Sequence, residues 1–316
     1  MIKILELFGG IGAPRKALMN LGVDVKSIDY VEINEKAVRS YNAMFDNSQK
    51  PQNVCGWNLK PDILVHGSPC QDFSIAGKQL GADKGSGTRS SLLYETLDII
   101  NNFGKWKPKV VIWENVKNVL SRYMKHNFYA YLEDMESMGY TNSFKVLNAI
   151  DFGLPQRRER VFVISILGGT AFYFGKLKKK DKVHISKYLD VEYGEQHIVS
   201  QPSMLKVINN EVDRYAFKGR VPIIDEYCYT ITTKQMRCPN SGVIRLEDGR
   251  YRYLTERECW RLQGFDDADF NKALLQNPSK PNCLNGSLYK QAGNSMLVNV
   301  LEAIFRVLLE LGVEHE

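Results

Sequence analysis

The stretch IKILELFGGIGAPRKALMN, residues 2–20, decides the fold of this chain. Its apolar beginning is typical of a buried strand over residues 2–8, and a glycine-rich turn follows. Residues 13–20 then predict a helix that ends near Gly22. In a strand–turn–helix unit of this kind, backbone N–H groups and the helix N-terminus can approach a ligand closely. The stretch therefore indicates an α/β fold and one candidate ligand site.

The glycine turn departs from the dinucleotide-binding fingerprint. Gly10 and Gly12 supply its first two glycines, but Arg15 occupies the third position. Glu32 follows Gly10 by 22 residues at the end of the next predicted strand, a spacing at which an acid accepts hydrogen bonds from a ribose. An ordinary tight turn remains an alternative for the turn alone, whereas an adenosine-containing cofactor without a pyrophosphate fits both observations.

The first half of the chain alternates strand-like and helix-like segments. Strands are predicted at 25–33, 63–66, 110–113, 144–149 and 161–167, and helices at 34–45 with Asn34 as N-cap, 92–103 and 128–138. This alternation predicts an α/β fold with a doubly wound, mostly parallel sheet, whose ligands bind outside the carboxyl ends of the strands. Since FGGIG (8–12), GSPC (67–70) and ENV (114–116) all stand at such ends, one crevice could gather them.

The second half of the chain is less regular. From about Gly168 it breaks into short Tyr-rich and Lys-rich pieces, including KLKKKDK at 176–182, and helical periodicity returns at 255–262 and 295–311. We therefore divide the chain into a catalytic and cofactor-binding domain at 1–167, a smaller irregular domain at 168–250 and a C-terminal segment at 251–316. The last helix needs a surface to pack on, which the first domain supplies.

Composition sets further limits. The chain has 316 residues, its longest apolar stretches are too short to span a bilayer, and its start lacks a signal-peptide pattern, so we expect a cytosolic protein without membrane contact. The six cysteines form no CxxC pair and no zinc-type spacing, which indicates neither a metal site nor disulfides. The net charge is +6, and residues 168–250 hold 14 Lys and Arg against 10 Asp and Glu, as a polyanionic partner would require.

Four side chains are candidates for chemistry. Cys70 follows Pro69 just past the third predicted strand, where a helix N-terminus or cation would stabilise a thiolate, although a lone cysteine is more often an inert buried thiol. Glu114 ends an apolar strand, where desolvation can keep a carboxyl protonated, and a solvent-facing acid is the alternative. Arg158 and Arg160 are two apart on an extended segment and so face the same way, either as an exposed basic strand end or as a pair that orients a carboxylate.

Taken together and in this order, these segments resemble the cytosine-5 DNA methyltransferases over nearly the whole chain outside the basic middle region. FGGIGAPRKAL looks like the family's cofactor loop, GSPCQDFS like its nucleophile loop, ENV like its catalytic-acid strand and QRRERVFVI like its arginine pair. RYLTERECWRLQGF (252–265) and YKQAGNSMLVNV (289–300) look like its two closing motifs. The resemblance implies the Rossmann-like fold of class I S-adenosylmethionine-dependent methyltransferases, with 168–250 as a target-recognition domain.

The resemblance also implies a cofactor pocket for S-adenosyl-L-methionine and its product S-adenosyl-L-homocysteine, without a metal. The residues assigned to this pocket are Phe8, Gly10, Gly12, Glu32, Ile33, Leu92, Asn294 and Ser295. One departure concerns the acid that the family places near the adenine amine, because the corresponding stretch around Asn53 has no carboxylate.

The same resemblance implies the chemistry of the site. It assigns catalytic roles to Cys70 and Glu114 and supporting roles to Pro69, Asn115, Val116, Arg158 and Arg160. Cys70 would add to C6 of cytosine and thereby activate C5, while a protonated Glu114 would hydrogen-bond to N3. A cytosine stacked in a duplex cannot reach such a pocket, so the base must be flipped out, and the loop 71–90 is a candidate lid.

We therefore predict a sequence-specific DNA (cytosine-5-)-methyltransferase that acts on double-stranded DNA as a monomer. The sequence leaves open the recognition site and whether a restriction endonuclease acting on the same site accompanies the enzyme. A tRNA cytosine-5 methyltransferase fits less well, because KNV (117–119) follows ENV where that subfamily has Cys-Phe-Thr. An inactive DNA-binding homologue is disfavoured because Cys70, Glu114 and Arg160 are all present, and a nicotinamide dehydrogenase is disfavoured by Arg15.

Overall fold

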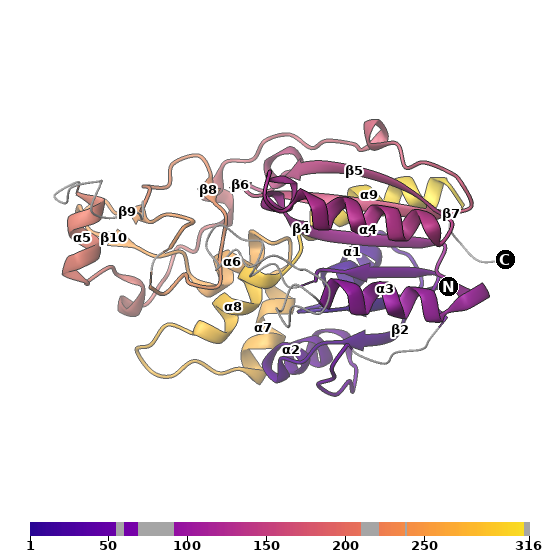
Figure 1. The fold of residues 1–316 in the computed structure, drawn as a ribbon. Coiled ribbons are helices and arrows are strands. Elements are labelled where there is room, and N and C mark those ends of the chain that lie inside the picture. The colour runs from indigo at the N-terminus through magenta and orange to yellow at the C-terminus, as the bar shows by residue number, and fades with distance from the viewer. Residues whose placement is uncertain (55–59, 69–91, 210–220, 238, 313–316) are drawn as a thin grey trace.

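The computed structural model describes residues 1–54, 60–68, 92–209, 221–237 and 239–312, except for the side chains of residues 27 and 28. Within these ranges the strands are β1 (Ile2–Leu7), β2 (Val25–Val31), β3 (Ile63–His66), β4 (Val110–Val116), β5 (Tyr140–Asn148), β6 (Gln156–Arg157), β7 (Glu159–Leu167), β8 (Cys228–Tyr229), β9 (Ile244–Arg245) and β10 (Tyr251–Arg252). The α-helices are α1 (Ala13–Asn20), α2 (Glu35–Phe45), α3 (Leu92–Asn102), α4 (Lys125–Ser137), α5 (Pro202–Ile208), α6 (Glu256–Arg261), α7 (Asp267–Gln276), α8 (Gly286–Asn294) and α9 (Val298–Glu310). Figure 1 shows an α/β body joined to a smaller lobe that contains α5, β9 and β10.

The central sheet has the strand order β2-β1-β3-β4-β7-β5. The first four strands of this order are parallel, whereas β7 runs antiparallel to both β4 and β5. The chain can reverse there because β5 and β7 follow each other without a crossover helix, which parallel neighbours would need. The predicted α/β fold with a mostly parallel sheet is confirmed. The strand order also places the carboxyl ends of β1, β2, β3 and β4 at one edge.

Helices cover both faces of this sheet. Alternate strand side chains point to opposite faces, so Ile4 and Ile63 join a core with α1, α2 and α9, whereas Leu5 and Leu64 join a core with α3 and α4. This burial on both faces explains why the strands are continuous apolar runs in the sequence. Layered burial of this kind gives the sheet edge a rigid support for a site.

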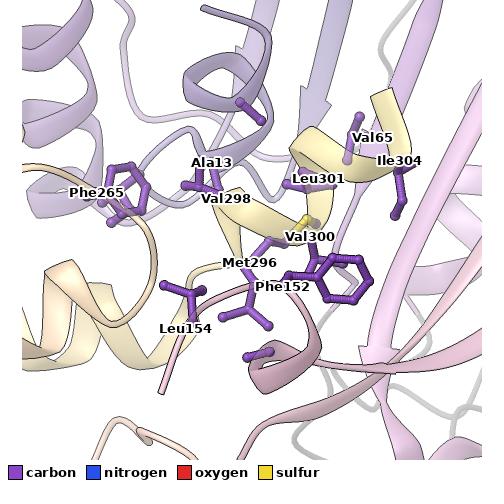
Figure 2. Packing of buried hydrophobic residues seen from close by; sticks show 14 of the residues in the cluster. Ala13, Val65, Phe152, Leu154, Phe265, Met296, Val298, Val300, Leu301 and Ile304 are labelled. Atoms are coloured by element: carbon purple, nitrogen blue, oxygen red, sulfur yellow. The ribbon is translucent and has the colours of Figure 1, made fainter. Parts of the chain in front are cut away.

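The C-terminal helix α9 completes the first of these cores. Figure 2 shows side chains from 296 to 304 meeting Val65 of β3 together with Phe152 and Leu154. By length and composition, the stretch Gly286–Glu310 is apolar enough to cross a membrane. It is longer than the apolar runs on which the expectation of no membrane contact was based. It consists of two helices, and 67% of its most apolar window is buried inside the fold. Packing against the sheet therefore accounts for its hydropathy.

The smaller lobe has its own apolar cluster. Its buried side chains are Val199, Met204, Ile208, Val221, Val243 and Tyr253. Before reaching this lobe, the chain runs along the α/β body, where Phe172 and Ile185 are buried in the body's core. The basic run at 176–182 is mostly exposed there, with Lys179 paired to Asp151. The connection between body and lobe is thus packed rather than a free linker.

Several element boundaries differ from the sequence prediction. The strand β4 continues to Val116, so ENV lies inside the strand, because β7 pairs with it as far as Arg160. The helix α8 was not predicted; Asn285 caps it by accepting the backbone N–H groups of Ser287 and Leu288. Thr255 and Glu258 form the predicted capping box at the start of α6.

Candidate active site

The first part of the site is the turn between β1 and α1. Phe8 and Gly10 have positive φ angles of 55° and 56°, so the chain leaves β1 through a left-handed bend. A Cβ added to Gly10 would meet no described atom within 4 Å. A Cβ added to Gly12 would lie 2.6 Å from a Tyr41 ring carbon and 2.5 Å from a Phe45 ring carbon. Gly10 therefore borders open space, whereas Gly12 allows α1 to start directly against α2.

Glu32 lies at the same edge of the sheet. One of its carboxylate oxygens accepts the N–H of Gly10 at 3.0 Å, and the other accepts the N–H of Asn34 at 2.8 Å. Asn34 is the predicted N-cap of α2 and accepts two backbone N–H groups there. The neighbouring Ile33 is 72% exposed, so an apolar side chain stands free beside the carboxylate. This corner offers a polar group and an apolar surface to one ligand.

Two buried tyrosines support the turn from below. The rings of Tyr30 and Tyr41 stack with centroids 3.7 Å apart, and the Tyr30 hydroxyl donates to the Gly10 carbonyl at 2.5 Å. Tyr41 donates to Glu6 at 2.7 Å and accepts from Arg15 at 3.2 Å. Arg15, which occupies the third position of the fingerprint, thus packs its side chain onto α2. Sequence reasoning missed this network, since isolated polar residues in apolar runs carry no periodic signal.

The acid of the site is Glu114 in β4. Its Oε1 lies 3.1 Å from Nε of Arg160 in β7, and the Glu114 and Arg160 side chains are only 12% and 13% exposed. Desolvation raises the pKa of Glu114, and the charges of Arg160 and Arg158 act in the opposite direction. Burial prevails, so this carboxyl holds its proton more tightly than a carboxyl in water does. A protonated carboxyl can donate a hydrogen bond to a ring nitrogen.

Gly67 brings the chain past β3 directly beside this acid. A Cβ added at Gly67 would lie 2.9 Å from Cε of Met296 and 3.8 Å from Oε2 of Glu114. A larger residue here would therefore require the end of the Met296 side chain to shift. Met296 is a component of the site that the sequence did not indicate, because its role depends on the C-terminal segment crossing the sheet edge.

Ser68 anchors the chain where it leaves β3. Its hydroxyl accepts from Trp113 Nε1 at 3.2 Å, and its carbonyl accepts from the Asn115 amide at 3.4 Å. Asn115 is 1% exposed, so it holds this segment from the interior. Pro69 and the predicted nucleophile Cys70 lie outside the described residues. The described chain leaves β3, which pairs with the Glu114 strand β4, and ends at Ser68, two residues before that cysteine.

The other residues predicted for the site lie at element ends. Val116 ends β4 opposite Arg160, and Leu92 begins α3, where it packs on the second core. Asn294 ends α8, and the next residue, Ser295, is 4% exposed, with its hydroxyl donated to the following carbonyl. The C-terminal segment thereby returns to the sheet edge near Glu114, although its residues are far away in sequence.

Arg158 and Arg160 reach different partners. Arg160 pairs with Glu114, whereas Arg158 is 2% exposed and donates to backbone carbonyls. Its Nη1 lies 2.8 Å from the Ile231 oxygen, and its Nη2 lies 2.9 Å from the Ser295 oxygen. Arg160 therefore forms the direct ion pair with the Glu114 carboxyl, whereas Arg158, which the sequence predicted as its companion at one carboxylate, acts on Glu114 through its charge while it bonds to backbone carbonyls.

Comparison with known proteins gives a consistent result. The family model for C-5 cytosine-specific DNA methylase matches residues 2–310. The type II methyltransferase M2.ScrFI of Lactococcus lactis subsp. cremoris is 32% identical over 98% of this chain and 99% of its own length. The type II methyltransferase M.NgoBI of Neisseria gonorrhoeae is 32% identical over 97% of this chain and 93% of its own length. The crystal structure of S. pombe Dnmt2 methyltransferase has a similar fold, with a TM-score of 0.76 at 20% identity, over 98% of this chain and 99% of that one.

Proposed function

Because the chain belongs to the C-5 cytosine-specific DNA methylase family, we propose that it methylates C5 of a cytosine within a specific sequence of double-stranded DNA. Its relatives are named type II methyltransferases, which supports methyltransferase activity and favours a role in a restriction-modification system. The arrangement around Glu114 is the observation that carries the proposal. A buried acid of raised pKa, paired with Arg160, stands next to the chain that leads to Cys70.

The turn after β1 and the end of β2 fit the family's methyl donor. C-5 DNA methyltransferases use S-adenosylmethionine, which would supply the transferred methyl group. Gly10 has open space above it, Glu32 holds two backbone N–H groups with further lone pairs available, and Ile33 is 72% exposed. In the proposal Glu32 accepts from the ribose and Ile33 packs on the adenine, with Phe8, Gly12, Leu92, Asn294 and Ser295 completing the pocket.

The target cytosine must leave the duplex to reach this site. Glu114 is 12% exposed at the edge of a sheet, a depth that a base stacked in DNA does not reach. In the proposal, the irregular segment 168–250 reads the duplex, its Lys and Arg side chains bind phosphates, and the base is flipped toward Glu114. The candidate lid of the proposal, residues 71–90, lies outside the described residues. Asn115, Val116 and Pro69 shape the walls around the base.

The chain's own residues perform the chemistry in three steps. The Cys70 thiolate forms a bond to C6, and the electrons of the C5–C6 double bond move to C5, where the ring becomes nucleophilic. Glu114, held by Arg160, donates its hydrogen bond to N3 and stabilises the charge that develops on the ring. After C5 has taken the methyl group, a base removes the C5 proton, the double bond returns and the bond between Cys70 and C6 breaks.

A labelling experiment tests this function. Tritiated S-adenosylmethionine is incubated with the protein and either a mixed duplex-DNA pool or a tRNA pool, and the labelled bases are identified. We expect tritiated 5-methylcytosine in DNA. Label in tRNA alone would favour a tRNA cytosine-5 methyltransferase, and no label in either pool together with retained DNA binding would favour an inactive DNA-binding homologue. Bisulfite sequencing of a plasmid methylated by the protein then gives the recognition site.

A further inference from the structure

The boundary between the α/β body and the smaller lobe contains a set of buried side-chain bonds to backbone. Residues 228–237, which we call the junction segment, enter the smaller lobe here, and Figure 1 shows β8 beside β6. Gln156 is fully buried, its Oε1 accepts the Ile231 N–H at 3.0 Å and its Nε2 donates to the Leu262 carbonyl at 2.8 Å. Arg158 donates to the Ile231 carbonyl at 2.8 Å. The backbone N–H and the carbonyl of Ile231 are thus both hydrogen-bonded to side chains of the α/β body.

Arg158 also connects this junction to the C-terminal segment. Its second terminal nitrogen donates to Ser295 at 2.9 Å and to Gly293 at 3.3 Å. A Cβ added at Gly293 would lie 2.5 Å from the carbonyl carbon of Thr232, so the two backbones touch. Met296 follows Ser295 and lies against the Gly67 position beside Glu114. The Arg158 guanidinium therefore holds both the junction segment and the chain that packs beside Glu114.

The junction segment is held by further hydrogen bonds and presents two exposed cations. The Thr230 hydroxyl donates to the Arg157 carbonyl at 3.0 Å, and Gln235, 2% exposed, donates to Ser241 at 2.6 Å. Lys234, Met236 and Arg237 are exposed on this segment. Long cationic side chains on a segment held in this way at a lobe boundary are suited to phosphates and base edges. Their reach to DNA depends on where the segment stands relative to Glu114.

We propose that Gln156 and Arg158 are positioning residues that fix the junction segment in register with Glu114, and that discrimination between DNA sites depends on this register. The inference rests on the proposed function, since it concerns how the enzyme selects its DNA. Base-edge contacts require placement to about half an ångström, so a segment released from these bonds loses cognate contacts and tolerates mismatched sites. Arg158 additionally positions the cofactor segment at Ser295, whereas Gln156 has no bond to that segment among those described.

Variants of Gln156 and Arg158 should therefore differ in their effect on cofactor binding. In Gln156→Leu we expect the KM for DNA to rise about tenfold. The preference for the cognate site over a site that differs by one base pair should also fall about tenfold, because buried hydrogen bonds are lost. The Kd for S-adenosylmethionine should stay within about twofold of the wild-type value. In Arg158→Lys both the KM for DNA and the Kd for S-adenosylmethionine should rise. Arg157→Lys, an exposed neighbour that keeps its charge, is the matched control and should leave all three unchanged.

A general loss of stability would lower the amount of active enzyme without changing the site preference, so the preference ratio is the decisive measurement. Thr230→Val removes a bond near the surface, preserves the fold and should reduce the preference about threefold even if the buried variants do not fold. Wild-type preference in both Gln156→Leu and Thr230→Val would overturn the proposal.

Hydrogen exchange separates this proposal from the proposed function. Amides of residues 229–232 should exchange at least about tenfold faster in Gln156→Leu than in the wild type, while β3 and β4 amides keep their protection. This comparison does not need methyl transfer. A wild type without transferase activity would refute the proposed function, whereas unchanged exchange at 229–232 would refute the positioning role alone.

Discussion

The charge state of Glu114 is set by two opposing effects. Its side chain is 12% exposed, and removal from water disfavours the carboxylate, whereas Arg160 at 3.1 Å favours it. Desolvation is the larger effect and raises the pKa. The ion pair therefore orients the carboxyl without forcing its ionisation, which suits the proposed role of Glu114 as a hydrogen-bond donor to the target base.

Replacement of Glu114 tests this balance through stability. The folded chain binds the Glu114 proton more tightly than the unfolded chain, so ionisation costs folding free energy as pH rises from the usual carboxyl value of 4.5 through the higher folded pKa. Glu114→Gln has no such cost. The free energy of unfolding of Glu114→Gln minus that of the wild type should therefore increase with pH across this window, measured by urea unfolding. A difference independent of pH would contradict the raised pKa.

The role of Cys70 is tested by a change of one atom. Cys70→Ser should abolish methyl transfer, because a neutral hydroxyl is a far weaker nucleophile than a thiolate, while S-adenosylmethionine binding remains. Duplex DNA with 5-fluorocytosine at the target should trap the wild type as a covalent adduct at Cys70, because fluorine cannot leave as the C5 proton does. Mass spectrometry locates the adduct. Wild-type turnover in the serine variant, or an adduct elsewhere, would exclude this nucleophile.

At the scale of elements, the start of α1 separates two kinds of glycine. Gly12 has a φ of 76° and lies against the rings of Tyr41 and Phe45 in α2, so the helix can begin only where a Cβ is missing. Gly10 has a φ of 56° but open space above it. One glycine therefore serves the packing of two helices, and the other leaves room at the sheet edge.

Two alanine variants should separate these roles. Gly12→Ala combines left-handed strain with overlap against two rings and should lower the free energy of unfolding by about 2–5 kcal/mol. Gly10→Ala carries only the backbone strain, about 1–2 kcal/mol, but places a methyl in the proposed cofactor space and should weaken S-adenosylmethionine binding severalfold. Urea unfolding and calorimetric titration measure the two effects. Equal stability losses with unchanged cofactor affinity would refute the distinction.

At the scale of the whole molecule, Glu258 joins three parts of the chain. Its fully buried carboxylate accepts both terminal nitrogens of Arg252, at 2.9 and 2.8 Å, and the backbone N–H groups of Asp190 and Thr255, each at 2.7 Å. Asp190 stands where the chain leaves the body, and Arg252 ends β10 where the chain returns. The capping residue predicted for a scaffold helix is thus also the ionic link between body and lobe.

Breaking this link should destabilise the molecule strongly. Arg252→Met leaves a buried carboxylate without its cation and should lower the free energy of unfolding by about 3–5 kcal/mol. Arg250→Met removes an exposed arginine two residues earlier, whose pairing with Asp248 is solvated, and should leave Tm unchanged. Thermal unfolding of the two variants provides the comparison. A similar Tm for both would show that the pair at Arg252 adds little.

The periods of the strands and helices and the order of the motifs were enough to predict the α/β fold and the family, because each is a property of short stretches of sequence. The N-cap at Asn34, the capping box at Thr255 and the acid that follows an apolar run could also be predicted, since each depends on a few neighbouring residues, although the strand continues two residues past that acid. The predicted direction of the effect at Glu114 follows from such a local pattern, an acid at the end of a buried run.

Which distant groups contact one another could be seen only in the folded chain. Arg158 bonds to carbonyls 73 and 137 residues away, and Met296 comes to lie against Gly67 beside Glu114. The sequence shows that Arg158 is a cation near another arginine, but the partner of a buried guanidinium depends on where the returning chain crosses the sheet edge. The packing of α9 and of the smaller lobe determines where that crossing lies, and this packing cannot be predicted from a local sequence pattern.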